Sequence, residues 1–505
     1  MAISNPGPGH SGTAGSLNSV PASQKATLSS NYIDFTSSDG SWAQQYLPDL
    51  MEKEAEVFGP RTISGFLAQV GAEEAMQSDQ VVWSEQGRLH LSYTGTVNNT
   101  NGEFSITHDI DGNALTTTHG VRLNDMVIVA TAEGAIKCLV TVVSGADVTC
   151  RPYEKEHIED ATAFGSGTSN AATLLVIGSE YAKGKQGQGA LASTTAGYGN
   201  VKPTHTSFTN KPIIIKDYYE VSGSDTTAIG WVEVTGEAGQ SGYLWYLKAE
   251  GDTRSRFSDY LEMTMLEAVK GIPGAAAANT VNDSDVDEFL SASGDSFGTE
   301  GLFAAIETRG NVTTGVTGVN AATDLAEFDA ILAEFDSQGA IEENMMFVNR
   351  ATSLAMDDML ASMNSYGAGG TSYGVFSNSE EMALNLGFSG FRRGSYDFYK
   401  SDFRYLNDKA TRGSINSRDV VAPVRGVMIP AGTTSVYDQM LGRNLKRPFL
   451  HVRYRANATE DRRMKTWITG SVGGAVTSDL DAMQVHYLSE RCLITQGANN
   501  FMMLK

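Results

Sequence analysis

The stretch from Pro448 to Trp467 constrains the fold most, because it joins the alternation of a strand to a dense run of positive charge. Apolar residues at 450, 452 and 454 alternate with His451, Arg453 and Arg455, the two-residue period of a strand with one buried face. Eight Lys or Arg against two acids give residues 443–465 a charge of +6, whereas the whole chain carries −22.

A basic cluster in an acidic chain needs an anionic partner, and the nearest supply of carboxylates is another copy of the same chain. The sequence therefore predicts contacts between copies through this stretch. The candidate residues are Arg447, Arg453, Arg455, Arg462, Arg463 and Lys465.

The bulk composition excludes several classes of protein. A chain of 505 residues with 41% hydrophobic residues has core material for two to four compact units. The net negative charge argues against a general nucleic-acid binder. Cys138, Cys150 and Cys492 form no CxxC pair, so we expect reduced thiols. We expect neither a signal peptide nor a membrane span.

The N-terminal half predicts loose and extended segments around an inserted module. Residues 1–45 are rich in Gly, Ser and Pro and predict a flexible arm. Residues 46–96 predict helices, in a pattern running from Trp42 to Met76 whose second helix ends near Gly71. A strand from Gln80 to Thr94 follows, interrupted by a Gln-Gly turn or bulge. Residues 97–178 carry short β-branched runs between Gly turns, as a small barrel or sandwich would. Residues 179–232 return as a long loop, and we expect the strand at 213 to pair with the strand at 81 as a projecting hairpin.

The C-terminal half predicts a long helix, an α/β unit and a final set of strands. Apolar residues from Phe257 to Ala268 repeat at three and four positions, which predicts a helix over 252–270 within a region spanning 233–280. Residues 281–440 predict an α/β domain with a helix closed by Gly339, a buried strand at 345–348 and a helix through Met356. Residues 441–505 predict strands.

The motifs that could carry chemistry lack their structural context. Residues 370–374 match GxSxG, but no strand leads into the motif and no helix follows it. Asp283, Asp285 and Asp287 alternate as in a calcium loop, yet the turn glycine and the final glutamate are missing. The glycines of 184–189 fit no phosphate-binding pattern, and the histidines are scattered. The aromatic residues 243–246 with Trp231 favour a core over an interface. We therefore expect no enzyme, no cofactor and no metal.

The order of segments resembles the major capsid protein of tailed bacteriophages, which has the Hong Kong 97-type fold. KPIIIKDYYEVSGSDTTAIGW followed by EGDTRSRFSDYLEMTMLEAVKG is similar to the return strand of that family's extended loop entering its spine helix. The closing VHYLSERCLITQGANNFMML is similar to capsid C-termini. The tail from GVMIPAG through RPFLHVRYRANATEDRRMKTWITGS is most similar to crAss-like phages.

The resemblance implies an α+β chain with an N-arm, extended loop, spine helix, peripheral and axial domains, and a small all-β insertion domain. It implies hexamers and pentamers that enclose double-stranded DNA in a virion, with portal and accessory capsid proteins as further partners and no membrane. Because some relatives crosslink a loop lysine to a neighbour, Lys183 and Lys185 are further candidates for contacts between subunits.

The resemblance leaves other uses of the chain open. An encapsulin-like compartment shares the fold, and a phage tail or receptor-binding protein could carry the β module. The basic stretch could contact packaged DNA in place of a neighbouring subunit. We predict that charge reversal at Arg453 and Arg455 stops assembly and leaves a folded subunit.

Overall fold

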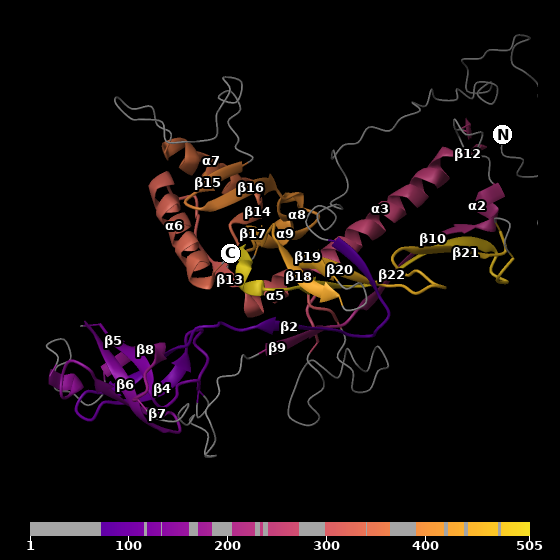
Figure 1. Ribbon diagram of the computed structural model, residues 1–505. Helices are drawn as coiled ribbons and strands as arrows, with labels where there is room; N and C mark the ends of the chain where they lie inside the picture. Colours follow the sequence, from indigo (N-terminus) through magenta and orange to yellow (C-terminus); the bar gives the residue numbers. More distant parts are fainter. Residues whose placement is uncertain are drawn as a thin grey trace, which may run out of the picture. The chain divides into compact units, whose positions relative to one another are not determined.

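The computed structural model describes residues 72–115, 119–132, 134–160, 170–183, 205–227, 233–235, 241–271, 298–339, 341–363, 390–418, 423–438, 443–472 and 476–505. The chain divides into two units, residues 1–61 and 62–505, and all described residues belong to the second. They form a mixed α/β structure with two main sheets and a closed barrel (Figure 1). The expected arm and the helices expected before residue 72 lie outside the described residues.

A five-stranded sheet is built around one long strand, β22 (Ala482–Thr495). On one side β22 pairs with β10 (Ile213–Ser222). On its other side it pairs first with β21 (Lys465–Gly470) and then with β20 (Leu450–Arg455), and β1 (Ala72–Met76) pairs with β20 in parallel. The strands expected in the last part of the chain are therefore confirmed.

The long helix α3 (Leu244–Glu267) lies against one face of this sheet (Figure 1). Phe257 and Leu261 pack on the alternate β22 residues Met483, Val485 and Tyr487. The predicted apolar stripe is confirmed at these helix positions, but Tyr260 is 43% exposed. The helix also starts earlier than the predicted residue 252, because it continues through Gly251, a weak helix former that interrupted the sequence pattern.

The second sheet has the order β13-β23-β17-β14-β16-β15. Its central strand β17 is buried at every residue. The strands are β13 (Asn311–Thr313), β14 (Glu343–Val348), β15 (Gly390–Arg393), β16 (Tyr396–Asp402), β17 (Gly426–Pro430) and β23 (Met502–Leu504).

Two helices cover one face of the second sheet through a shared apolar core (Figure 1). They are α6 (Ala321–Gln338) and α7 (Arg350–Met363). Asn320 caps the start of α6 by accepting a hydrogen bond from the Thr323 amide, and Gly339 ends it with φ 67°, where a residue without a Cβ is favoured. The predicted helix closed by Gly339, the helix through Met356 and the strand at 345–348 are confirmed.

A second core joins the two sheets. Leu450, Val452 and Leu493 of the first sheet pack in one cluster with Val427 and Ile429 of β17. The helices that contribute to it are α5 (Leu302–Arg309) and α8 (Arg404–Asn407), and the short helix α9 (Arg412–Asn416) follows α8.

The inserted β-rich module is a closed barrel of order β3-β4-β7-β6-β5-β8. Its strands are β3 (Ser92–Asn98), β4 (Glu103–Asp109), β5 (Asp125–Thr131), β6 (Gly134–Ser144), β7 (Asp147–Pro152) and β8 (Asn170–Ser179), with the 3-10 turn η1 (Ile158–Asp160). The barrel begins at Ser92, before the expected residue 97, because Tyr93 and Val97 are side chains of its core. At Gly95 a Cβ would lie 2.0 Å from the Ser105 carbonyl oxygen, so the close approach of β3 and β4 requires glycine there.

A two-stranded ribbon leads into and out of the barrel along the chain. β2 (Val81–Gln86) pairs antiparallel with β9 (His205–Asn210). The expected pairing of the strand at 81 with the strand at 213 is therefore wrong. Pro212 separates β9 from β10 because it has no amide to donate, and β10 pairs with β22 instead.

Residues 72–76, which follow the predicted end of the second helix near Gly71 but still belong to the helical pattern, form a strand. The sequence AEEAM has strong helix propensity, but it forms β1 because β20 offers a free edge and arginines for the two glutamates. The remaining elements are η3 (Ala498–Asn500), α2 (Gly223–Thr227) and the strand pairs β11 (Glu233–Thr235) with β12 (Ser241–Tyr243) and β18 (Thr433–Asp438) with β19 (Arg443–Pro448).

Candidate assembly surfaces

The basic cluster predicted from the sequence is paired with carboxylates of its own chain. Arg453 Nη2 lies 2.8 Å from Glu74 Oε2 across the β1–β20 pair. Arg455 contacts Asp79, and this hydrogen bond is the main cause of the raised pKa of its guanidinium. Asp79 belongs to the exposed turn after β1. The strand β1 and this turn therefore neutralise the basic strand.

The opposite face of β20 repeats this arrangement. Glu73 lies 2.5 Å from Arg463 and 3.6 Å from Arg491 of β22. Arg491 is 7% exposed, and burial lowers the pKa of its guanidinium, an effect that the negative charge of Glu73 opposes. A buried cation without a nearby carboxylate would be costly, so Glu73 stabilises the folded position of Arg491.

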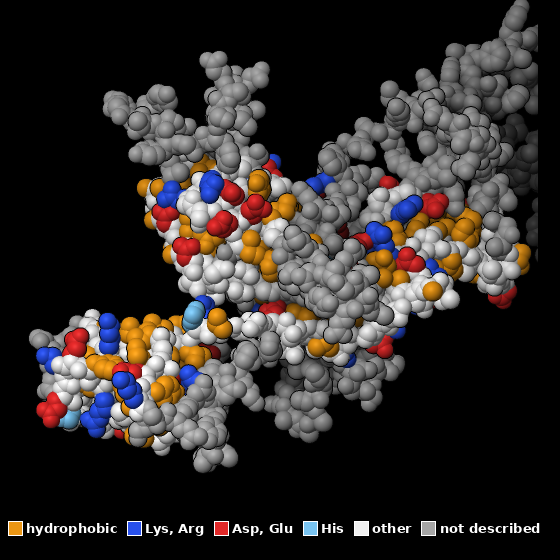
Figure 2. Space-filling model, viewed as in Figure 1, with side chains coloured by type: hydrophobic (Ala, Val, Ile, Leu, Met, Phe, Trp, Pro, Cys, Tyr) orange, Lys and Arg blue, Asp and Glu red, His pale blue; other side chains and the backbone are white. Residues whose placement is uncertain are grey.

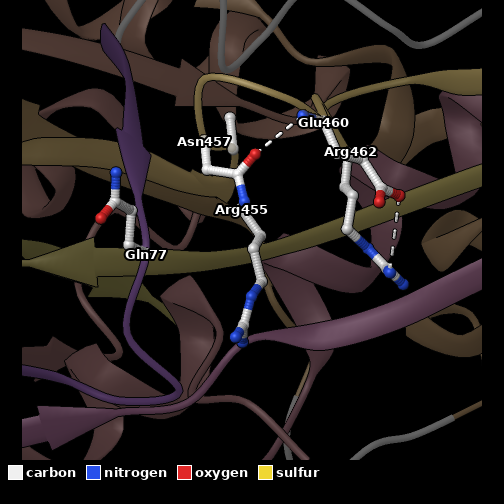
Figure 3. A pocket seen from close by; sticks show the side chains of 6 residues that line it. Gln77, Arg455, Asn457, Glu460 and Arg462 are labelled. Carbon is white, nitrogen blue, oxygen red and sulfur yellow. Dashed lines mark hydrogen bonds and ion pairs between the residues drawn. The ribbon is translucent and has the colours of Figure 1, made fainter.

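A polar cavity of about 360 Å³ lies beside the end of β20 (Figure 3). Glu490 Oε2 lies 2.7 Å from Arg462 Nε, and its other oxygen lies 3.3 Å from Arg455. Across the cavity, the Glu460 amide donates to Asn457 Oδ1, and the Glu460 carboxylate lies 2.7 Å from Lys465 Nζ. This hydrogen bond with Lys465 is the main cause of the lowered pKa of Glu460. The cavity is thus lined by charges that are already matched.

The predicted contact residues Arg453, Arg455, Arg462, Arg463 and Lys465 all lie at this cluster. The backbone of Arg447 pairs with Thr434 in the β18–β19 hairpin, and its side chain lies outside the described residues. Lys183 is exposed in a turn, whereas Lys185 lies outside the described residues. A contact of these residues with another subunit stays a prediction, and charge reversal at Arg453 and Arg455 would also weaken the attachment of β1.

His451 does not point to solvent as the alternation predicted. It is 1% exposed, like its neighbours Leu450 and Val452. The physical reason is that Ile494, the register partner of His451 on β22, belongs to an apolar cluster with Trp83 and Phe208 of the ribbon strands, so the sheet face that carries His451 is covered there.

Among the described residues, part of the first sheet's face opposite α3 is exposed. Tyr218 of β10, His486 of β22 and Trp467 of β21 are register partners in one row across three strands. The Trp467 and His486 rings stack with centroids 5.1 Å apart, and the Tyr218 ring lies 5.9 Å from His486. We call this row the aromatic ladder. Figure 2 shows hydrophobic side chains among basic and acidic ones over the region that β10 and β21 occupy in Figure 1.

The open face combines apolar surface with charge. Tyr218 is 55% exposed and Ile214 on the same strand is 53% exposed. A groove of about 550 Å³ runs along the ladder, with Lys216 and Asp217 at its border. Aromatic rings flanked by charged groups are typical of surfaces that bind another protein.

The ribbon β2/β9 is fixed at its base by one arginine. Arg309 of α5 places its guanidinium 4.5 Å from the centre of the Phe208 ring and 5.6 Å from that of Trp83. The same guanidinium binds Glu300 at 2.6 Å, and the Arg309 side chain is 12% exposed. We call these contacts the Arg309 clamp. No local pattern in the sequence predicts the ring contacts, because Phe208 and Trp83 are each more than 100 residues from Arg309.

A buried asparagine completes the base of the ribbon. Asn210 is fully buried, and its side chain donates to the carbonyls of Leu493 at 2.6 Å and Glu300 at 3.1 Å. Its Oδ1 accepts from the Glu300 amide and from the Thr299 hydroxyl. Such a saturated amide holds the end of β9 in one position.

The described part of the chain contains no cluster of three or more metal-ligating side chains. None of its described helices is long and apolar enough to cross a membrane. Cys138, Cys150 and Cys492 are free and buried, as the expectation of reduced thiols requires. The GxSxG motif at 370–374, the aspartates at 283–287, the glycines at 184–189 and the side chains of 243–246 lie outside the described residues, as does Trp231.

Comparison with known proteins finds similarity in solved structures alone. No family model matches the chain. No curated protein matches it either. A structure from Microbacterium phage Oxtober96 is 10% identical, with 94% of this chain and 99% of that chain covered and a TM-score of 0.36. A structure from Mycobacterium phage Ogopogo is 11% identical, with 90% and 96% covered and a TM-score of 0.38. The mature capsid of bacteriophage PhiM1 is 7% identical, with 90% and 91% covered and a TM-score of 0.37.

Proposed function

We propose that this chain is the major capsid protein of a tailed bacteriophage, with the Hong Kong 97-type fold, and that its mechanism is self-assembly. Copies join as hexamers and pentamers into an icosahedral shell around double-stranded DNA. Portal and accessory proteins complete the virion, and the lineage is that of the crAss-like phages. The chain has no catalytic role in this proposal.

The observation that carries the proposal is that the ribbon beyond its fixed base and one face of the first sheet both expose apolar side chains among the described residues. A two-stranded ribbon such as β2/β9 is marginally stable alone. Val82 of this ribbon is 61% exposed. The open face with the aromatic ladder is a second uncovered surface on the same subunit. Two different complementary patches on one chain generate a ring when the rotation between copies closes.

In this arrangement the ribbon of one copy lies on the open face of the next. Ile214 and Tyr218 supply apolar area there, and Lys216 supplies charge. Contacts of this kind, repeated around a capsomer, reach the size of obligate interfaces. The basic cluster is a weaker candidate for DNA contact, because its described arginines already face carboxylates.

The test is assembly of the purified full-length chain, followed by size-exclusion chromatography and negative-stain electron microscopy. Closed shells built of hexamers and pentamers are expected. Trimers or fibres would favour a tail or receptor-binding protein. Empty shells formed in cells without portal or packaged DNA would favour an encapsulin-like compartment. A compact monomer at high concentration would refute all three.

A matched pair of variants tests the surface that is used. Tyr218→Glu places a charge on the aromatic ladder, whereas Leu354→Glu places one on α7 at a site of similar exposure, 52% against 55%. We expect Tyr218→Glu to remain folded by circular dichroism and to form no shells, and Leu354→Glu to form normal shells. Normal shells from Tyr218→Glu would exclude the open face as an interface.

A further inference from the structure

The strand β1 occupies an edge of the first sheet that it contacts mainly through charge. It pairs in parallel with β20, from Ala72 opposite His451 to Met76 opposite Arg455. Among the side chains described in β1, Met76 alone is buried, at 7% exposed. A single buried side chain contributes about 1.5–3 kcal/mol, so apolar packing holds this strand weakly.

The arginines beside the edge of β20 favour an acidic strand as its partner. Glu74 pairs with Arg453 on one face, and Glu73 pairs with Arg463 and Arg491 on the other. A strand without these carboxylates would leave the buried Arg491 without its nearest opposite charge. Such an uncompensated buried cation is strongly destabilising. The occupant of the edge therefore must carry two adjacent acidic residues in this register.

A second copy of the chain offers the same occupant. Its β1 has the same sequence and reproduces each backbone and ion-pair contact, so exchange between copies loses none of them. The connection from β1 to β2 is also suited to such exchange, because Gln77, Ser78, Asp79 and Gln80 are all exposed.

We infer that β1 is exchanged between copies in the assembled state, so that β1 of one subunit binds the β20 edge of its neighbour. The inference rests on the proposed self-assembly and adds the partner of the basic cluster, which is the acidic strand 72–76 of another copy. The predicted contact of Arg453 and Arg463 between subunits then uses the same ion pairs that the single subunit forms.

A disulfide across the strand pair tests the exchange. Ala75 and Tyr454 are register partners, so a chain carrying both Ala75→Cys and Tyr454→Cys brings the two thiols together. Shells are assembled under reducing conditions, oxidised and run on a denaturing gel without reductant. Exchange predicts loss of the monomer band to a ladder of covalent multimers. Monomers with an internal disulfide, or no disulfide at all, would overturn the inference.

The controls separate this outcome from failure of assembly. The wild-type chain is oxidised in parallel, and its three buried cysteines are expected to form no multimers. Each single-cysteine variant must form shells by electron microscopy. Absence of shells from the wild-type chain refutes the proposed function, whereas intact shells with monomeric subunits refute the exchange alone.

Charge reversal gives a second test that needs no oxidation. One chain carries Glu73→Lys and Glu74→Lys, and another carries Arg453→Glu and Arg463→Glu. Neither chain can pair its own β1 with its own β20, but in a mixture each β1 matches the other chain's β20. Because two chains cannot alternate around a ring of five, the readout is the formation of oligomers and not of closed shells. Exchange predicts oligomers from the mixture and monomers from either chain alone by size-exclusion chromatography. No oligomers from the mixture, with oligomers from a chain carrying all four substitutions, would refute it.

Discussion

The Arg309 clamp yields a quantitative prediction for the ribbon β2/β9. Replacing Arg309 with Ala removes its contacts with the ribbon, which are the Phe208 and Trp83 rings and the Glu85 carboxylate at 3.7 Å. A cation–π contact contributes about 0.5–1 kcal/mol or somewhat more when desolvated, and an ion pair of this length about 0–1 kcal/mol. We therefore expect the ribbon to lose about 1–3 kcal/mol of local stability.

Hydrogen exchange of the unassembled full-length subunit measures this loss. Because each 1.4 kcal/mol is tenfold in an equilibrium constant, amides of 81–86 and 205–210 should exchange about 5- to 150-fold faster in Arg309→Ala. Amides of β14, which lies in the second sheet, should keep their protection. Arg350→Ala is the matched control, since Arg350 also pairs with a carboxylate, Asp402 at 2.6 Å, but is 63% exposed.

An exposed pair of that kind contributes about 0–1 kcal/mol, so the control should change exchange by less than about fivefold. If the ribbon amides exchange at the wild-type rate in Arg309→Ala, the clamp does not hold the ribbon. The backbone pairing and Asn210 would then be sufficient. If every amide of the subunit exchanges faster, the arginine stabilises the whole fold and has no local role.

Three further predictions concern the thiols and the barrel. Burial raises the pKa of Cys138 and Cys492 to about 12. Cys138 should therefore resist alkylation at pH 8 until the barrel opens, and Cys492 until the first sheet opens. Mass spectrometry of pulse-labelled protein can detect this. The pKa values of the two thiols in the folded protein lie above the ordinary thiol pKa of 9.0. The two buried thiols therefore contribute fully to the free energy of unfolding below pH 9, and this contribution is lost as the pH rises toward about 12. Urea unfolding should therefore show a falling free energy of unfolding in that window, and a constant value would contradict the effect. A fragment of residues 90–181 should fold alone and give a β-rich circular dichroism spectrum, since the barrel has its own core. Gly95→Ala should prevent folding of that fragment, because the added Cβ meets the Ser105 carbonyl. An equally folded Gly95→Ala fragment would show that the strands can shift.

Local patterns in the sequence predicted those parts of the fold that local forces determine. The helix α6 was predicted because its apolar period and closing glycine lie within one segment, and Gly339 has the expected left-handed conformation. The barrel was predicted because its strands are short, β-branched and separated by turns. The buried strand β14 was found from its continuous apolar run.

The failures share one physical cause, which is that distant partners override local preference. The sequence AEEAM prefers a helix, yet β20 supplies hydrogen bonds and arginines about 380 residues later in the chain. The partner of β2, the strand at 205–210, lies in a polar segment typical of a loop, so the sequence favours the apolar run at 213 as its partner. The charge on Arg453 was visible, but the position of Glu74 beside it depends on the assembled sheet.

The place of β22 and β23 in the two sheets has a consequence for synthesis on the ribosome. β22 pairs with β10, β20 and β21, and β23 lies between β13 and β17, so residues 482–504 contribute an inner strand to each sheet. Neither sheet can close before these residues have left the exit tunnel, whereas every barrel strand lies within residues 92–179. We expect the barrel to fold during translation, whereas the two sheets stay incomplete until synthesis of residues 482–504. We expect chaperones to shield the unpaired strands of the nascent chain during that time.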